Sequence, residues 1–278
     1  MISGQTLALE PFVARRTANR CTGRPAENDH MSVETQQTSG PTSCTRPSGF
    51  FRFWRLLFVF LVMAHLYPIR FGILRLAMIL AAVVVWFGVP LLIRKRRWVW
   101  PLWVAATLVV CALFLGPGRP ESPQALRQEY VRSLQRYSDV RYVWGGENTR
   151  GVDCSGLVRA ALIDADINRG ISTLNPALMR EACRLWWFDS SADALQKQYR
   201  HNTASEFIAP SLNRPGRSRI LPGDLAVTES GQHVLAYIGD YAWIEADPYA
   251  MRVITIIAPS KSVWFDQPMR IIRWRQFR

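Results

Sequence analysis

Long apolar runs fill the first half of the chain, and short alternating segments fill its end. Residues 76–93 are 18 consecutive positions without a charge, and residues 98–116 form a second uncharged run. Each run is long enough to cross a bilayer as a helix. The first extends to a predicted span of residues 73–93 if the side chain of Arg75 snorkels. Residues 53–69 have a shorter uncharged core, which indicates a short span or an interfacial segment.

The two long runs are separated by four consecutive basic residues, Arg94, Lys95, Arg96 and Arg97. Short loops rich in Lys and Arg stay on the cytoplasmic side of a membrane, so the chain after residue 116 should emerge on the opposite side. This holds whether or not residues 53–69 span. The alternative, buried core helices of a soluble protein, fits two uncharged runs around a basic cluster less well.

The remaining segments give the domain organisation. Residues 1–50 are polar, rich in Thr, Ser, Pro and Gly, and are expected to form a disordered tail. Residues 51–116 form the membrane region and residues 117–122 a linker. In the first part of residues 123–278, apolar residues recur at helical spacing. From Leu221 onward, short β-rich segments alternate with turn residues. The prediction is an α+β domain, with N-terminal helices packed on an antiparallel sheet, preceded by a transmembrane helical hairpin.

Charge and cysteine content narrow the class of protein. The net charge of +13 is uneven: residues 1–122 carry a net +9 and residues 123–278 a net +4. A basic excess beside apolar runs fits membrane topology and anionic lipid, and no nucleic-acid-binding motif appears. The five cysteines are scattered, without the spacing of a disulfide framework or of a zinc site.

One cysteine lies where a nucleophile would be expected. Asp153-Cys154-Ser155-Gly156 precedes a predicted helix from Leu157 to about Asp164. The positive end of the helix dipole and the unpaired N–H groups there favour thiolate over thiol. Gly145 and Gly146 allow the chain to approach this helix closely. For an arbitrary cysteine, a small buried core residue is the commoner explanation. The rest of the chain must therefore show whether Cys154 is a nucleophile or a core residue.

A catalytic thiolate needs a base, and the base needs an orienting group. His201 lies in a polar stretch and is predicted to be a surface residue, whereas His233 begins a predicted strand. A three-residue turn after that strand would place Glu245 and Asp247 on the face of His233. A two-residue turn would place neither there. A solvent-exposed Glu245 on an edge strand is the alternative.

Four segments taken together resemble the NlpC/P60 family of papain-like cysteine peptidases. They are residues 142–146 (YVWGG), 152–158 (VDCSGLV), 221–225 (LPGDL) and 233–239 (HVLAYIG). The resemblance covers about residues 123–278. Members of this family are cell-wall endopeptidases that cut peptidoglycan stem peptides, typically between D-glutamate and the diamino acid.

The resemblance implies roles for individual residues. Cys154 would be the nucleophile, His233 the base, and Tyr142 an oxyanion-hole donor together with the Cys154 backbone N–H. The other positions assigned to substrate binding are Asp153, Ser155 and Trp144. No metal or cofactor is implied.

The sequence departs from the family pattern in two places. Where the family commonly has a histidine as third polar residue, this chain has Glu245, which can orient an imidazole at least as well. The 69 positions between Ser155 and Asp224 indicate an insertion at about residues 166–220, a candidate lid.

The resulting expectation is a membrane-anchored cell-wall hydrolase. Its partners would be peptidoglycan stem peptides and, through two or three spans, the bilayer of the bacterial inner membrane, with the catalytic domain on the periplasmic side. Two alternatives remain open: an inactive papain-like binding module at the membrane, and a thiol amidase or acyltransferase acting on another substrate.

Overall fold

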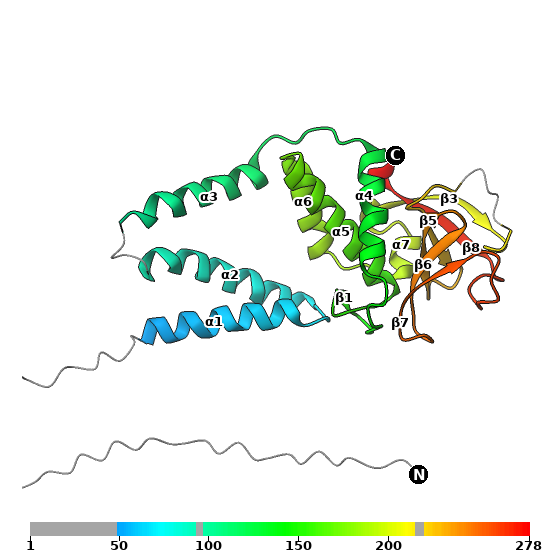
Figure 1. Cartoon of the computed structure of the whole chain (residues 1–278), viewed down its shortest axis with the longest axis horizontal. Helices are drawn as coiled ribbons and strands as arrows, with labels where there is room; N and C mark the ends of the chain where they lie inside the picture. The colour runs from blue at the N-terminus through cyan, green and yellow to red at the C-terminus, as the bar shows by residue number, and fades with distance from the viewer. Residues whose placement is uncertain (1–48, 93–96, 215–219) are drawn as a thin grey trace, which may run out of the picture. The chain divides into compact units, whose positions relative to one another are not determined.

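The computed structural model describes residues 49–92, 97–214 and 220–278. The predicted disordered tail, with Cys21 and Cys44, therefore lies almost wholly outside the described residues. Three apolar helices come first: α1 (Gly49–Leu66), α2 (Gly72–Leu92) and α3 (Val99–Leu115) (Figure 1). The helices α1 and α2 are long and apolar enough to cross a membrane, and α3 is a shorter apolar helix of 17 residues. The segment at residues 53–69 thus lies in a longer helix than its short uncharged core indicates.

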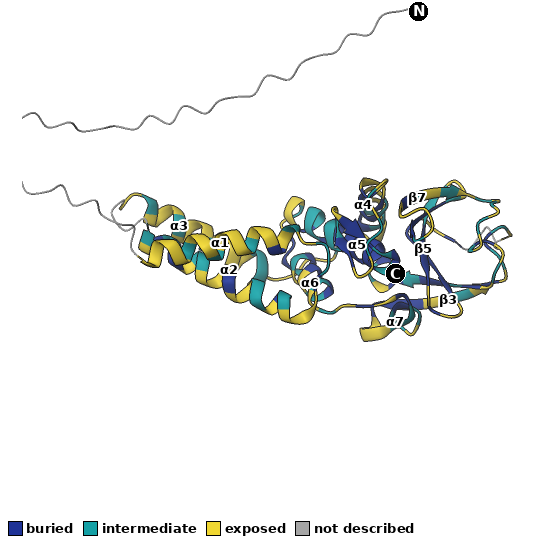
Figure 2. Cartoon of the chain, turned by 90° about the horizontal axis from the view of Figure 1, so that it is seen from below, coloured by how far each residue is buried: buried dark blue, intermediate teal, exposed yellow. Residues whose placement is uncertain are grey.

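The apolar helices contact one another through tryptophan side chains. Trp54 of α1 donates a hydrogen bond from Nε1 to the carbonyl oxygen of Val85 in α2, at 3.1 Å. Gly88 permits this approach, because a Cβ atom there would lie 2.7 Å from the Trp54 ring. Trp103 of α3 donates to the carbonyl oxygen of Trp86 at 3.3 Å. Many of the other residues on these helices are exposed, as the colouring of Figure 2 shows. The large side chains among them are apolar, which suits a lipid environment better than water.

Four helices follow in the globular part: α4 (Pro123–Arg136), α5 (Cys154–Ser172), α6 (Pro176–Trp187) and α7 (Ala192–Gln196). Each begins at a side-chain cap. Ser122 accepts from the Ala125 N–H, and Asp153 accepts from the Gly156 N–H. Asn175 and Ser191 cap α6 and α7 in the same way. Such caps satisfy N–H groups that have no acceptor within the helix, and so they fix where each helix starts.

A six-stranded antiparallel sheet lies beside these helices. Its strand order is β3-β8-β4-β5-β6-β7. The strands are β3 (Thr203–Ala209), β4 (Leu225–Thr228), β5 (Val234–Gly239), β6 (Ala242–Asp247), β7 (Arg252–Ile257) and β8 (Met269–Trp274), and a two-stranded ribbon joins β1 (Glu147–Asn148) to β2 (Gly151–Val152). The α+β class predicted from the sequence is confirmed.

The segment at residues 166–220, predicted as an insertion, holds the end of α5, all of α6 and α7, and β3. Strand β3 pairs antiparallel with β8, from Thr203 opposite Trp274 to Ala209 opposite Met269. Much of this segment therefore belongs to the layers of the domain itself.

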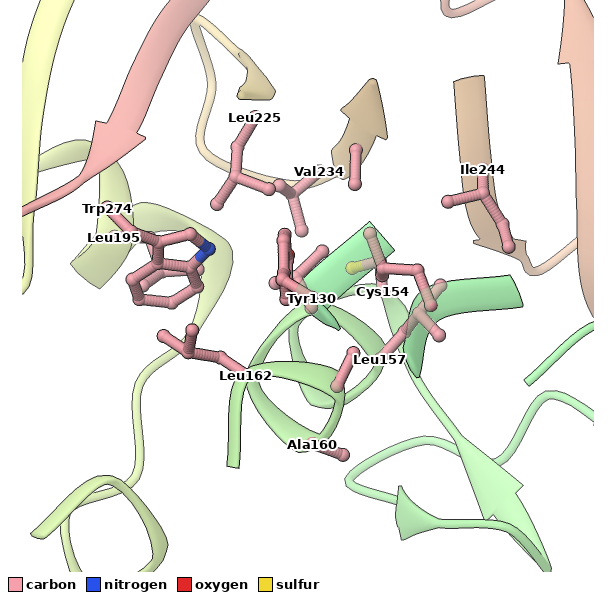
Figure 3. Close-up of a cluster of buried hydrophobic side chains, with 14 of the residues drawn as sticks. Tyr130, Cys154, Leu157, Ala160, Leu162, Leu195, Leu225, Val234, Ile244 and Trp274 are labelled. Carbon is pink, nitrogen blue, oxygen red and sulfur yellow. The ribbon is translucent and has the colours of Figure 1, made fainter. Parts of the chain in front are cut away.

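Both faces of the central strands are buried. On one face, Leu225 and Val227 of β4 pack with α4 and α5 in a core that reaches Leu157 and Cys154 (Figure 3). On the other face, Ala226 belongs to a second cluster with side chains such as Trp243 and Phe265. Cys154 therefore lies at the edge of the main core, where α5 meets the sheet.

Substituting Leu157 by Ala tests the importance of this core. Leu157 is fully buried, so its truncation should lower the free energy of unfolding by about 2–5 kcal/mol. Leu174→Ala is the matched control, because Leu174 is exposed. Urea unfolding followed by pulse proteolysis in detergent measures both variants. Equal stabilities of the two would contradict the placement of Leu157.

Candidate active site

The site begins at the first turn of α5. Cys154 is the first residue of the helix and is preceded by the cap, Asp153. One Asp153 carboxylate oxygen accepts the Gly156 N–H at 2.6 Å and the Ser155 hydroxyl at 2.9 Å, and the other accepts the Gly145 N–H at 2.8 Å. Burial raises the pKa of Asp153, and these hydrogen bonds oppose the rise. Asp153 thus joins the glycine turn to the start of the helix.

His233 lies next to Cys154, immediately before β5. Its ring nitrogen Nε2 contacts the Glu245 carboxylate, and both side chains are buried. Burial lowers the pKa of His233, but interactions with Cys154 and Glu245 outweigh this effect and raise the pKa to about 9. Burial also raises the pKa of Glu245, against the opposing effect of His233. Because Nε2 is occupied by Glu245, Nδ1 is the ring nitrogen left for the thiol.

The β5–β6 hairpin places Glu245 by an unexpected route. Gly239 pairs with Ala242, so the turn has two residues, Asp240 and Tyr241, both with positive φ. A two-residue turn in a regular hairpin would turn Glu245 away from His233. A register shift at Ile238, between Tyr237 and Gly239, places Glu245 on the same face of the sheet as His233 again. The expectation that only a three-residue turn would bring this carboxylate to His233 was therefore wrong.

Trp264 completes the surroundings of the histidine. Its ring stacks on the His233 imidazole, with centroids 4.2 Å apart and planes 18° apart. The residue lies in the loop before β8, and no motif or spacing in the sequence marks it. Stacking fixes the plane of the imidazole, while Glu245 fixes its rotation within that plane.

A cavity of about 540 Å³ opens over Cys154. Five of the predicted site residues line it, namely Tyr142, Trp144, Asp153, Cys154 and Ser155. Burial, with a smaller contribution from Cys154, raises the pKa of Tyr142 to about 12, so its hydroxyl stays a hydrogen-bond donor at neutral pH. Lining residues that the sequence did not indicate include Arg159, Asp189 and Gln232.

The other two predicted site residues, His233 and Glu245, do not line the cavity: His233 interacts with Cys154, and Glu245 lies behind His233. Asp247, the alternative to Glu245, instead accepts the Tyr249 N–H at 2.7 Å. Within the described part of the chain, no group of three or more His, Cys, Asp or Glu side chains is arranged to hold a metal ion.

Comparison with known proteins identifies the domain. Residues 139–273 match the model of the NlpC/P60 family. This part of the chain is an NlpC/P60 domain. The NlpC/P60 family includes peptidoglycan hydrolases, and the match supports a cysteine peptidase or hydrolase. A comparison with curated proteins finds no match.

Solved structures give distant likenesses. NlpC1 from Trichomonas vaginalis is 16% identical, with a TM-score of 0.37, over 56% of this chain and 46% of that one. The peptidoglycan hydrolase RipB from Mycobacterium tuberculosis is 20% identical, with a TM-score of 0.34, over 54% of this chain and 65% of that one. This chain thus spans less than two thirds of the length of either protein.

Replacing Glu245 by Gln tests whether the Glu245 carboxylate raises the pKa of His233. We expect the pKa of His233 to fall below about 9, because a neutral amide no longer stabilises the imidazolium. Since the folded pKa exceeds the ordinary value of 6.5, this group stabilises the fold fully below pH 6.5, and the stabilisation is lost as the pH rises through about 9.

NMR titration of ¹³C-labelled histidine measures this pKa, with His233→Gln to assign the signal. Asp247→Asn is the matched control and should leave the titration unchanged. An unaltered pKa in Glu245→Gln would contradict the role of the carboxylate.

Proposed function

We propose that this protein hydrolyses amide bonds in the stem peptides of peptidoglycan, at the bond between D-glutamate and the diamino acid. The observation that carries the proposal is the pairing of Cys154, which lines an open cavity, with a buried His233–Glu245 couple. Such a pair generates a thiolate nucleophile and an acid for the leaving group. A protein that only binds its ligand has no need of it.

The reaction follows from the positions of these groups. His233 accepts the proton of the Cys154 thiol, and the sulfur attacks the amide carbonyl carbon. The oxyanion that forms can be stabilised by the Cys154 backbone N–H, in the first turn of α5, and by the Tyr142 hydroxyl. His233 then protonates the leaving amine, and a thioester remains on Cys154. Water attacks the thioester, with His233 accepting its proton, and the carboxylate product leaves.

Asp153 and Ser155 suit the amino end of a stem peptide. The Asp153 carboxylate lines the cavity and receives three hydrogen bonds from its own surroundings. These bonds hold the carboxylate in one orientation while its negative charge can still attract an ammonium group. Trp144 is exposed at the cavity edge and offers an apolar surface to the peptide.

We further propose that the protein is anchored in the bacterial inner membrane by three spans, with the catalytic domain in the periplasm. Contacts of the α1–α2 turn with the domain support this: the Glu147 N–H donates to the carbonyl oxygen of Pro68 at 3.1 Å. The turn and the domain must then share one side of the membrane. The α2–α3 connection, with its four basic residues, falls on the other side, in agreement with the positive-inside rule.

Substituting Cys154 by Ala should abolish release of muropeptides from purified peptidoglycan, because no other group in the cavity can form the thioester. Mass spectrometry of the digest identifies the bond that is cut. Cys183→Ala is the matched control, since Cys183 is an exposed helix residue away from the cavity. Retained cleavage in Cys154→Ala would refute the mechanism. A wild-type protein whose Cys154 reacts with iodoacetamide but that releases nothing would move the search to other amides.

Cysteine labelling tests the topology. With the five native cysteines replaced by Ser, a membrane-impermeant maleimide should label Lys197→Cys in intact spheroplasts. Lys95→Cys and Ser32→Cys should be labelled only after permeabilisation. Labelling of Ser32→Cys from outside would leave two spans in place of three, and labelling of Lys95→Cys would invert the topology.

A further inference from the structure

The turn between α1 and α2 contacts the glycine turn that lines the cavity over Cys154. Ile69 forms an antiparallel bridge with Gly146, and the Asn148 side-chain amide donates to the carbonyl oxygen of Tyr67 at 2.8 Å. With the bond from Glu147 to Pro68, these contacts follow the chain from Gly146 to Asn148. A segment from the apolar N-terminal region thereby becomes a neighbour of the active-site loop.

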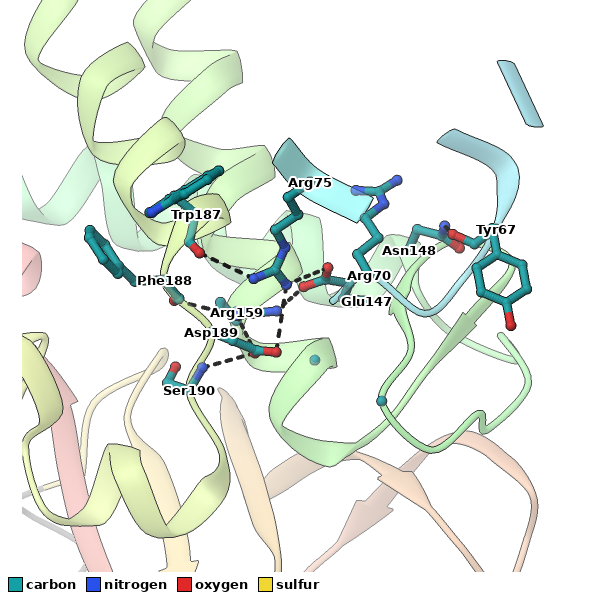
Figure 4. Close-up of polar contacts among 12 residues, drawn as sticks. Tyr67, Arg70, Arg75, Glu147, Asn148, Arg159, Trp187, Phe188, Asp189 and Ser190 are labelled. Carbon is teal, nitrogen blue, oxygen red and sulfur yellow. Dashed lines mark hydrogen bonds and ion pairs between the residues drawn. The ribbon is translucent and has the colours of Figure 1, made fainter. Parts of the chain in front are cut away.

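A cluster of charges, buried except for Asp189, reinforces this junction (Figure 4). Arg75 of α2 lies 2.7 Å from one oxygen of Glu147, and Arg159 of α5 contacts the other. Arg159 also contacts Asp189, whose second oxygen lies 3.6 Å from Arg75. Arg75, Arg159 and Glu147 are 2%, 2% and 4% exposed. Arg75 also donates to the carbonyl oxygen of Trp187 at 3.2 Å.

The cluster is connected directly to the catalytic helix. Arg159 belongs to α5 itself, five positions after Cys154, and both it and Asp189 line the cavity. Glu147 follows Gly146, whose carbonyl oxygen accepts the Asp153 N–H at 3.0 Å. That carbonyl also packs so closely on Gly156 that no Cβ could be placed there. A displacement of Glu147 would therefore disturb the glycine turn where it meets the cap of α5.

We propose that Arg75 is a positioning residue for the active site, so that the α1–α2 hairpin is a structural component of the peptidase as well as an anchor. Arg75 cross-links the two segments that wall the cavity, one around Glu147 and the other around Asp189. Without it, Arg159 alone faces both carboxylates, and the side chain of Glu147 loses its contact with the hairpin, although its backbone N–H still donates to Pro68. A buried carboxylate that loses one of two arginines tends to move toward water, because its desolvation is no longer offset. The catalytic consequence rests on the proposed function, whereas the structural one does not.

Hydrogen exchange of the full chain in detergent tests the structural consequence. In Arg75→Gln we expect exchange in a peptide covering residues 143–151 to rise at least tenfold, while a peptide covering residues 233–247 stays as in the wild type. Arg52→Gln is the matched control, because Arg52 is exposed on α1, and it should change neither. Unchanged exchange at residues 143–151 in Arg75→Gln would overturn the proposal.

If Arg75→Gln also raises exchange at residues 233–247, the variant has unfolded more widely. Asn148→Ala then decides, because it removes the bond to Tyr67 without uncovering a buried charge. Because Asn148 also accepts the Arg150 N–H, the readout is the Glu147 amide, which donates to Pro68. A several-fold rise at this amide supports the docking of the turn, and no change overturns it.

Kinetics test the catalytic consequence. Because Arg75 acts on the cavity walls and not on the His233–Glu245 couple, Arg75→Gln should raise KM for cell-wall substrate at least fivefold. The rate at which iodoacetamide alkylates Cys154, and its pH profile, should stay within twofold of the wild type. Arg75→Lys should restore part of the loss, since one ammonium cannot bridge both carboxylates as the planar guanidinium does. An unchanged KM would overturn the catalytic part. A wild type that releases no muropeptides refutes the proposed function alone, because the exchange result still decides the structural part.

Discussion

The cap of α5 by Asp153 is the interaction on which the active site depends. One carboxylate fixes where the helix starts, holds Ser155 and ties the Gly145 turn to the helix. Cys154 can then only be the first helical residue, with its side chain at the edge of the core and beside His233. A helix starting one residue later would rotate the thiol by about 100°, away from its base. This constraint is local, because residues 153–156, which are consecutive in the sequence, form most of it.

Features encoded locally were predictable for that reason. The cap, the glycine turn and the period-two strands all appear within short windows, and they sufficed for the α+β class and for a shared site around Cys154, His233 and Glu245. The four segments that resemble the NlpC/P60 family added the order in which the nucleophile and its base occur along the chain. The spacing of apolar runs likewise located the helices of the N-terminal region, although α1 begins earlier and α3 is shorter than the uncharged runs indicate.

Features that depend on distant contacts were not predictable. The register shift at Ile238 has no sequence signature, yet it decides which face of β6 meets His233. Trp264 reaches the imidazole only because the loop before β8 folds back over β5. Arg75 is the clearest case. An arginine near the end of an apolar run is expected to snorkel toward water, but here it is 2% exposed and paired with Glu147. Nothing in the run itself reveals that a carboxylate from a residue 72 positions later will cover it.

The position of Arg75 has a consequence for how an enzyme of this kind is confined. A soluble hydrolase domain on a flexible linker would keep its activity if released from its anchor. Here the connection between α3 and α4 is only one attachment, and the α1–α2 turn adds a second, built from backbone hydrogen bonds and buried ion pairs. Buried ion pairs contribute little net stability but strongly disfavour geometries in which one partner is missing. Such a junction therefore favours one placement of the domain on its hairpin, and the cavity walls take their shape from that placement. In the proposed membrane-anchored peptidase, anchoring and the shape of the cavity are then properties of the same contacts.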